Sequence, residues 1–360
     1  MVSSCFLHNL EYLSQRCFKR LAIFLVCISP SWAFAILGNN GLGKPSPMEA
    51  NALTGKALAD YLNQNQQLFK AEANGDEEIY KLKLMDLKFV GRGPLTEEDY
   101  FFDDSNDTDI PESFDARVEW PDCPSLKSIR DQANCGSCWA VSSAEAMSDR
   151  VCIASKGVKK MLLSADDILS CCTKCGFGCN GGWPIMAWQY FVQKGICTGG
   201  AYGEKGVCKP YEISPCGHHK NETYYGECND LAETPKCLRK CQDGYPKSYK
   251  DDKIFGKTAY AVPGSVSAIQ RDIMKNGPVV AAFTVYSDFM QYKSGIYKHT
   301  VGGEEGGHAV KIIGWGSENG VPYWIIANSW NSDWGEDGFF RMIRGENDCG
   351  IEENIVAGLV

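Results

Sequence analysis

The distribution of cysteine constrains this chain more than any other feature. Of the 18 cysteines among its 360 residues, three precede position 28 and fifteen follow position 122, and residues 36–109 contain none. So many cysteines in one part of a chain are typical of a disulfide framework, which forms only in an oxidising compartment. The fold therefore depends on whether the chain enters such a compartment.

The N-terminus predicts that it does. Three basic residues within positions 16–20 precede the apolar run 21–28, and Ala33 and Ala35 supply the small residues that a signal peptidase accepts. We expect a signal peptide over residues 1–35. The alternative is a membrane anchor, but the run is too short to cross about 30 Å of hydrocarbon. Cleavage leaves fifteen cysteines, and an odd number requires at least one free thiol.

Composition narrows the class of protein. With 44% hydrophobic and 11% aromatic residues, the chain can bury a large core as one large or two medium domains. The net charge of −9, without a basic cluster, argues against nucleic acid or an anionic membrane surface as partners. We expect neither nucleic-acid binding nor a membrane span.

Residues 36–109 differ from the rest of the chain. They lack cysteine, contain a helix-like pattern over residues 51–70 and finish in the acidic run 97–109. Between a signal peptide and a cysteine-rich body, such a segment is typical of a removable pro-segment. The alternatives are a small independent domain or a linker.

The body divides into two halves by local pattern. Residues 110–256 mix cysteine-rich loops with helical periodicity, with one helix beginning at Cys138 and another over 184–195 that ends at Gly195. Residues 257–360 contain short β-rich runs separated by Gly, Pro and Asn, which favour a twisted antiparallel sheet or barrel. A helical half and a sheet half should meet along a cleft.

Two cysteines in "QANCGSCWA" admit three interpretations. Zinc binding would need a second pair, from "CCTKCGFGC" or "CLRKC", and would compete with disulfide formation. A redox pair would follow a strand in a βαβ pattern, which is absent. We favour a bridged Cys135 and a nucleophilic Cys138, because the N-terminus of a helix stabilises a thiolate.

A thiolate nucleophile needs a base and a group that orients the base. His308 begins a β run beside two glycines that leave room for a substrate, whereas His299 is typical of a solvated loop. Asn328 ends the next strand of the expected hairpin and is followed by Trp330, which would exclude water. The alternatives are a non-catalytic homologue, which would lack one of these groups, and a disulfide-rich binding module, which would not need the thiol.

These segments resemble a known family. "CGSCW", "GGHA" and "ANSWNSDWG" are similar to the nucleophile, histidine and asparagine segments of papain-family cysteine proteases, over about residues 110–360. The segment "CKPYEISPCGHHKNETYYGEC" resembles the occluding loop of the cathepsin B-like subfamily. The resemblance implies an α+β, papain-like two-domain fold, with a helical left domain, an antiparallel β-barrel-like right domain and the active site between them.

The resemblance also implies an activity and partners. It predicts a secreted or lysosomal zymogen of a peptidase with endopeptidase and dipeptidyl carboxypeptidase activity and no cofactor. Its partners would be protein and peptide substrates, its own pro-segment as inhibitor, and cystatin-type inhibitors. Asn106 and Asn221 begin N-x-Thr sequons, where glycosylation is expected.

Site residues follow from the same resemblance. Cys138 would pair as a thiolate with imidazolium His308, Asn328 would hold the ring, and Gln132 would join the Cys138 N–H in an oxyanion hole. The substrate-binding residues implied are Gly181, Gly182, Trp183, Pro184, Ala282, Ala309, Trp330, Asn354, His218 and His219.

Asn354 stands where cathepsin B has a glutamate that accepts arginine before the residue at the scissile bond. The adjacent Glu353 should not replace that glutamate, because neighbouring side chains of an extended segment point to opposite faces. The pocket is therefore predicted to be neutral and apolar.

The occluding loop should be fastened less firmly than in the family. Asp131 and Asp333 match the two acidic partners that hold it, but the arginine that would reach Asp333 is missing, and Lys220 lacks its bidentate fork. One fastening is expected to remain, between His218 and the loop anchor Asp131.

The resemblance further implies a disulfide pattern that leaves Cys138, Cys197 and Cys349 unpaired. Cys197 has no counterpart in the usual pattern and is expected to be a buried, inert thiol, with dimer formation as the alternative. The implied pairs are Cys123–Cys152, Cys135–Cys179, Cys171–Cys237, Cys172–Cys175, Cys208–Cys241 and Cys216–Cys228.

Overall fold

The computed structural model describes residues 47–73, 75, 77–91, 93–95, 109–220 and 222–360. The predicted signal peptide, most of the acidic run and both sequon asparagines, Asn106 and Asn221, lie outside these residues. The chain divides into two units, residues 1–44 and Pro45–Val360, and everything described below belongs to the second unit. No helix of the described residues is long and apolar enough to cross a membrane.

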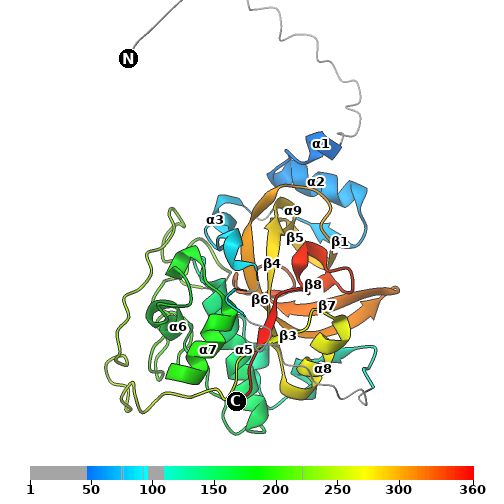
Figure 1. The fold of residues 1–360 in the computed structure, drawn as a ribbon. Coiled ribbons are helices and arrows are strands. Elements are labelled where there is room, and N and C mark those ends of the chain that lie inside the picture. The colour runs from blue at the N-terminus through cyan, green and yellow to red at the C-terminus, as the bar shows by residue number, and fades with distance from the viewer. Residues whose placement is uncertain (1–46, 74, 76, 92, 96–108, 221) are drawn as a thin grey trace, which may run out of the picture. The chain divides into compact units, whose positions relative to one another are not determined.

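A nine-stranded sheet organises this unit. Its strands follow the order β1-β5-β8-β7-β6-β4-β9-β3, and the short β2 also pairs with β6. The long hairpin of β6 and β7 lies at the centre (Figure 1). The strands are β1 (Phe69–Ala71), β2 (Phe114–Asp115), β3 (Tyr260–Val262), β4 (Val279–Tyr286), β5 (Tyr292–Tyr297), β6 (Glu304–Glu318), β7 (Val321–Ala327), β8 (Phe339–Ile343) and β9 (Ile355–Ala357).

Three helices form a group beside the sheet. These are α5 (Cys138–Ala154), α6 (Ala165–Cys171) and α7 (Pro184–Lys194), drawn in green in Figure 1. As the sequence predicts, α5 begins at Cys138 and α7 ends before Gly195, whose φ of 66° suits glycine. The other helices and 3₁₀ turns from α4 onward are α4 (Ala116–Glu119), η4 (Pro124–Lys127), η5 (Gly178–Asn180), α8 (Val266–Asn276), α9 (Ser287–Met290) and η6 (Asp348–Gly350).

The predicted pro-segment packs on the body through short elements. They are α1 (Pro47–Ala50), α2 (Gly55–Asn65), β1, α3 (Glu77–Lys81) and η2 (Leu87–Phe89). The helix-like pattern over residues 51–70 forms a shorter helix than its extent indicates. The Gln66 side chain accepts from the N–H groups of Leu68 and Phe69, which turns the chain into β1, and β1 then pairs with β5.

The predicted α+β class is confirmed, but the prediction of a barrel-like, wholly antiparallel sheet is wrong in two respects. β1 and β3 are the ends of the strand order, so the described sheet is not a closed barrel. β5 and β8 run parallel. The chain passes from β4 through α9 to the far side of the β6–β8 meander, and β5 therefore arrives in the direction of β8.

The six disulfides implied by the resemblance are all present. Their Cα atoms lie 4.3–5.7 Å apart. Cys138, Cys197 and Cys349 are free. Cys197 is buried, and burial followed by the charge of Asp167 raises the pKa of its thiol far above the usual range, so the inert thiol is the better description.

Helix α5 is fastened to the sheet half by buried charge. Arg150 donates five hydrogen bonds, among them 2.6 Å to Asp272 of α8, 2.8 Å to the Tyr260 hydroxyl of β3 and 3.1 Å to the Gly358 carbonyl. Asp149, the residue directly before Arg150 in α5, accepts from Lys311 of β6 at 2.8 Å. These pairs fix the helix that carries Cys138 against the strand that carries His308.

Replacing Arg150 tests this fastening. We expect Arg150→Met to lower the free energy of unfolding by about 3–5 kcal/mol, because Asp272 then remains buried without its partner charge. The control Lys56→Met removes an exposed pair with Asp60 in α2 and should cost less than about 1 kcal/mol. Guanidinium unfolding of the full chain with intact disulfides measures both, and equal effects would contradict the account.

Candidate active site

The Cys138 thiol lies at the first position of α5 and is free and fully buried. Burial raises the pKa of this thiol to about 12, although the backbone N–H groups of Ala309, Trp139 and Cys138 itself act in the opposite direction. The N–H groups are those expected at a helix N-terminus. With the pro-segment in place, burial therefore outweighs the helix and keeps the thiol protonated.

His308 and Asn328 meet across the β6–β7 hairpin. Nε2 of His308 lies 2.7 Å from Oδ1 of Asn328. Nδ1 of His308 has no hydrogen-bond partner among the described residues. The Ala309 N–H reaches the Cys138 sulfur, so the β6 backbone directly after His308 contacts the thiol. The hairpin thus brings the segment that carries the predicted base to the start of α5, and the pairing of the imidazole with the thiol stays a prediction.

The surroundings of His308 favour its neutral form. Burial lowers the pKa of the imidazole to about 4; the hydrogen bond that Asn328 Oδ1 accepts from the ring raises it, and the charge of Lys83 lowers it further. The Trp330 ring covers the imidazole, with 4.8 Å between the ring centres. This matches the water-excluding position expected for Trp330.

Gln132, the predicted oxyanion donor, is occupied by the pro-segment. Its Nε2 donates to the Lys83 carbonyl at 2.7 Å and to the Cys135 carbonyl at 2.7 Å. Its Oε1 accepts from the Ser329 hydroxyl at 2.7 Å, which fixes the amide orientation. A pro-segment carbonyl therefore rests on the side-chain donor that a substrate carbonyl would need.

The pro-segment continues along the cleft from Lys83 to Leu95. Met85 forms a two-way backbone pair with Gly307 at 2.9 and 2.8 Å. Phe89 then packs against Trp183, with 4.8 Å between ring centres. The glycines predicted for substrate binding permit this approach, because a Cβ on Gly181 would lie 2.5 Å from the Phe89 ring and a Cβ on Gly182 would lie 2.7 Å from Trp139.

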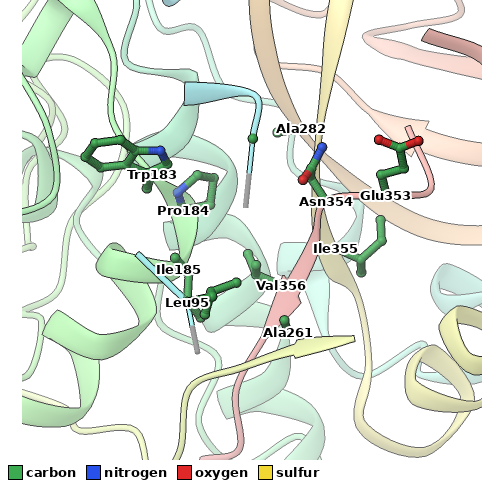
Figure 2. Close-up of a pocket in the computed structure, with 11 residues that line it drawn as sticks. Leu95, Trp183, Pro184, Ile185, Ala261, Ala282, Glu353, Asn354, Ile355 and Val356 are labelled. Carbon is green, nitrogen blue, oxygen red and sulfur yellow. The ribbon is translucent and has the colours of Figure 1, made fainter. Parts of the chain in front are cut away.

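The predicted specificity pocket contains the end of this segment. Figure 2 shows the residues that line this hollow, with Leu95 of the pro-segment among them. Its lining includes Trp183, Pro184, Ala282 and Asn354 from the predicted set, but not Ala309, which is buried opposite Ala282 in β6. Ala309 instead contributes its N–H at the Cys138 sulfur.

Glu353 also borders this hollow but is turned away from its apolar part. In Figure 2 the Asn354 amide lies nearer to Trp183 and Pro184, whereas the Glu353 carboxylate lies farther off. That carboxylate accepts from Asn347 at 2.6 Å. The expectation that neighbouring side chains diverge here agrees with this arrangement.

The occluding loop, between Cys216 and Cys228, is fastened by a different histidine than expected. Nε2 of His219 lies 3.3 Å from Asp131, and its Nδ1 lies 3.1 Å from Asp333. The prediction of a His218–Asp131 pair is wrong. His218 is exposed and stacks on Tyr224 within the loop, with 4.4 Å between ring centres.

One histidine thus serves both acidic partners. The hydrogen bond that Asp333 accepts from the ring raises the pKa of His219, burial lowers it, and the charges of Asp131 and Asp333 raise it further, so the net shift is upward. His219 thus occupies a position between two carboxylates that favours its protonated form.

Three contacting residues escaped the sequence analysis. Asn331 donates 3.3 Å to Asp131 and 3.1 Å to Glu222 of the loop, and Lys83 reaches Asp131 from the pro-segment at 3.3 Å. Asn331 has a φ of 73°, a left-handed conformation that asparagine tolerates. No spacing or periodicity indicates these partners, because each joins segments that are distant in sequence.

The cysteine pattern provides no metal centre at the nucleophile. Cys135 is bonded to Cys179, which rules out the zinc interpretation of that motif. Among the described residues, Cys197, Cys208 and Asp252 could approach one ion, but Cys208 is already bonded to Cys241. Without a thiolate from either cysteine, this group lacks the donors that zinc requires.

Comparison with known proteins agrees with this geometry. Residues 110–359 match the model of the papain family cysteine proteases. The chain is 59% identical over 317 residues to "Cathepsin B-like cysteine proteinase 1" of Ostertagia ostertagi, covering 87% of this chain and 92% of the relative. It is 50% identical over 312 residues to a "Gut-specific cysteine proteinase" of Caenorhabditis elegans, covering 85% and 91% respectively.

A solved structure extends the likeness to the pro-segment. "proCathepsin B S9 from Trypanosoma congolense" superposes with a TM-score of 0.69 at 37% identity, covering 85% of this chain and 98% of that chain.

Proposed function

The chain belongs to the papain family of cysteine proteases and is a cathepsin B-like cysteine peptidase, and from that premise we propose that Cys138 and His308 are its catalytic pair. Asn328 holds the imidazole through the 2.7 Å contact, and Gln132 supplies one oxyanion donor. The observation that supports this most directly is that the Gln132 amide donates to a pro-segment carbonyl, while Cys138 at the start of α5 is a free, buried thiol. The assignment makes residues 36–109 the pro-segment, 110–256 the nucleophile half and 257–360 the base half.

Removal of the pro-segment starts the reaction by changing protonation. Water and substrate enter, the burial that keeps Cys138 and His308 neutral is reduced, and the helix N–H groups then favour the thiolate–imidazolium pair. The thiolate attacks the scissile carbonyl. The carbonyl oxygen, which becomes negative, accepts hydrogen bonds from Gln132 Nε2 and the Cys138 N–H. His308 protonates the leaving amine, and water then hydrolyses the thioester.

The pro-segment acts as the chain's own inhibitor. It places a carbonyl on Gln132, a backbone pair on Gly307 and Leu95 in the specificity pocket. We expect acid to release it, since protonation of the acidic run 97–109, most of which lies outside the described residues, would loosen any charge pairing with the body. Cystatin-type inhibitors would compete for the uncovered cleft, and the predicted signal peptide supports a secreted or lysosomal site of action.

Thiol labelling tests the nucleophile and its covering together. After removal of residues 36–109, we expect iodoacetamide to label Cys138 at neutral pH at least about 100-fold faster than in the full chain, because the thiolate fraction rises. Cys138→Ser should reduce peptide hydrolysis by about 10³-fold or more, while the matched variant Cys197→Ser retains activity. An active Cys138→Ser enzyme would refute the assignment.

The pocket around Asn354 determines a preference for neutral residues before the residue at the scissile bond. Its lining is apolar except for Asn354 and the diverted Glu353. A carboxylate at Asn354 would face the hollow and pair with an arginine side chain.

We therefore expect Phe, Val or Leu to be preferred over Arg at this substrate position. Asn354→Glu should raise the Arg-to-Phe ratio of kcat/KM by about tenfold or more through a new buried charge pair. The control Glu353→Gln should leave the ratio nearly unchanged. Faster turnover of Arg-Arg than Phe-Arg substrates by the wild type would contradict the proposal.

The occluding loop supplies dipeptidyl carboxypeptidase activity in this proposal. His219 is engaged by Asp131, Asp333 and the Cys216 carbonyl and so fastens the loop. The exposed His218 is available to the C-terminal carboxylate of a substrate. The two histidines, treated alike from sequence, thus divide into an anchor and a carboxylate-binding residue.

The fastening should depend on pH. The pKa of His219 in the folded chain is raised above its ordinary value, so the anchor is fully present below about pH 6.5 and is lost only as pH rises through the higher folded value. Release of dipeptides should therefore be strongest in acid and give way to endopeptidase activity above, not at, about pH 6.5.

Free-acid and amidated peptides, compared between about pH 4.5 and 8, separate the two roles. His219→Ala should shift products towards endopeptidase cleavage at all pH values, whereas His218→Ala should raise KM for free-acid peptides and keep the pH dependence. A product ratio that neither substitution nor pH alters would overturn this account of the loop.

A further inference from the structure

The pro-segment buries a lysine ammonium next to the catalytic groups. The side chain of Lys83 is 3% exposed and that of Asp131 is 9% exposed, with 3.3 Å between Nζ and Oδ1. A buried ammonium is costly unless it is paired, so Asp131 is the reason that a lysine fits here. The backbone carbonyl of the same Lys83 accepts from the Gln132 side chain. One pro-segment residue therefore contacts both Asp131 and the proposed oxyanion donor next to it in the sequence.

The two oxygens of Asp131 serve different partners. Oδ2 faces His219 and Asn331, both at 3.3 Å, and so holds the loop side of the cleft. Oδ1 accepts from the Ala133 N–H at 2.7 Å and otherwise from Lys83. When the pro-segment leaves, the loop contacts of Oδ2 can persist, but Oδ1 loses its cation.

The position of Lys83 along the cleft is also defined. Residues 91 and 95 lie at the specificity pocket, whereas Tyr80 and Lys83 lie with His218, His219 and Asp333 at the loop end. The cation therefore occupies the side of Gln132 that faces the loop, where the leaving half of a substrate would bind.

We propose that Asp131 Oδ1 is a cation subsite for the substrate residue directly after the scissile bond, and that Lys83 occupies it in the zymogen. The inference rests on the proposed protease function and adds a substrate class to it: peptides with Lys or Arg at that position. The subsite admits an ammonium or guanidinium at the end of a long apolar stem, as Lys83 itself demonstrates.

The surrounding charges favour a cation. Asp333 is 3.1 Å from His219, and Glu222 shares the Asn331 amide with Asp131, so three carboxylates converge. Among the described residues, the cations in contact with them are His219 and, from the pro-segment, Lys83. Loss of Lys83 leaves this group more negative than it is in the zymogen, which attracts a basic side chain.

The substrate test uses the activated enzyme and internally quenched, C-terminally amidated peptides that differ only after the scissile bond, with Lys, Arg, norleucine or Glu. We expect kcat/KM for Lys and Arg to exceed that for norleucine by about tenfold and that for Glu by more. Asp131→Asn should abolish this preference. His219→Ala, which loosens the loop but keeps the Asp131 charge, should retain it.

These outcomes separate the two proposals. If no peptide is cleaved by an enzyme that is folded, the protease assignment fails. If all four are cleaved at similar rates, or if Asp131→Asn retains the Lys preference, the assignment stands and the cation subsite is wrong.

The zymogen provides an independent test without substrate variation. Lys83→Met keeps the length of the stem but leaves Asp131 without its cation, so the full chain should activate faster at mildly acidic pH than the wild type. Lys88→Met, which removes an exposed pair with Asp86 in the same segment, should activate at the wild-type rate. Equal rates for Lys83→Met and wild type would overturn the role given to Lys83.

Discussion

The burial of helix α5 between helices α6 and α7 and the sheet is the constraint on which the rest of the molecule depends. Residues 138–152 are all buried, so both the polar and the apolar side chains of this helix need partners in the protein. Arg150 and Asp149 find theirs in α8, β3 and β6. The helix N-terminus is thereby held where Cys138 meets the strand that carries His308, which is the geometry that a nucleophile and its base require.

Cys138 and His308 are also fully buried while the pro-segment lies in the cleft, and this burial affects their protonation. A thiol at a helix N-terminus is poised to ionise, yet here exclusion of water raises its pKa to about 12 and lowers that of His308 to about 4. Lys83 adds a positive charge that disfavours a second one on the imidazole. In the proposed mechanism the pro-segment therefore acts on the protonation of Cys138 and His308 as well as on access to the cleft, and its removal would reverse both effects.

How far the sequence predicts this structure depends on how far apart along the chain the interacting residues lie. The start of α5 at Cys138 and the hairpin that joins His308 to Asn328 follow from local periodicity and capping, and both are confirmed. The disulfide pairs needed a family resemblance, since spacing alone allows many connectivities. The failures lie in irregular segments. The sequence provides no reason to distinguish His218 from His219, and only the folded loop shows that His219 is the one that faces Asp131.

Asp131 is the residue in an irregular segment that joins the largest number of functional parts of the molecule. It lies next to Gln132 in sequence, and through one carboxylate it contacts the pro-segment, the occluding loop and the strand-end residue Asn331. Burial and these partners act together on the carboxyl group: burial raises its pKa, whereas the charge of Lys83, the Ala133 N–H and the charge of His219 lower it, and the net shift is downward. Lys83 thus acts on both members of the anchor, because its charge lowers the pKa of Asp131 and also lowers that of His219. Removal of the pro-segment would therefore uncover the cleft and, through the same carboxylate, change the electrostatics of the contact that holds the loop.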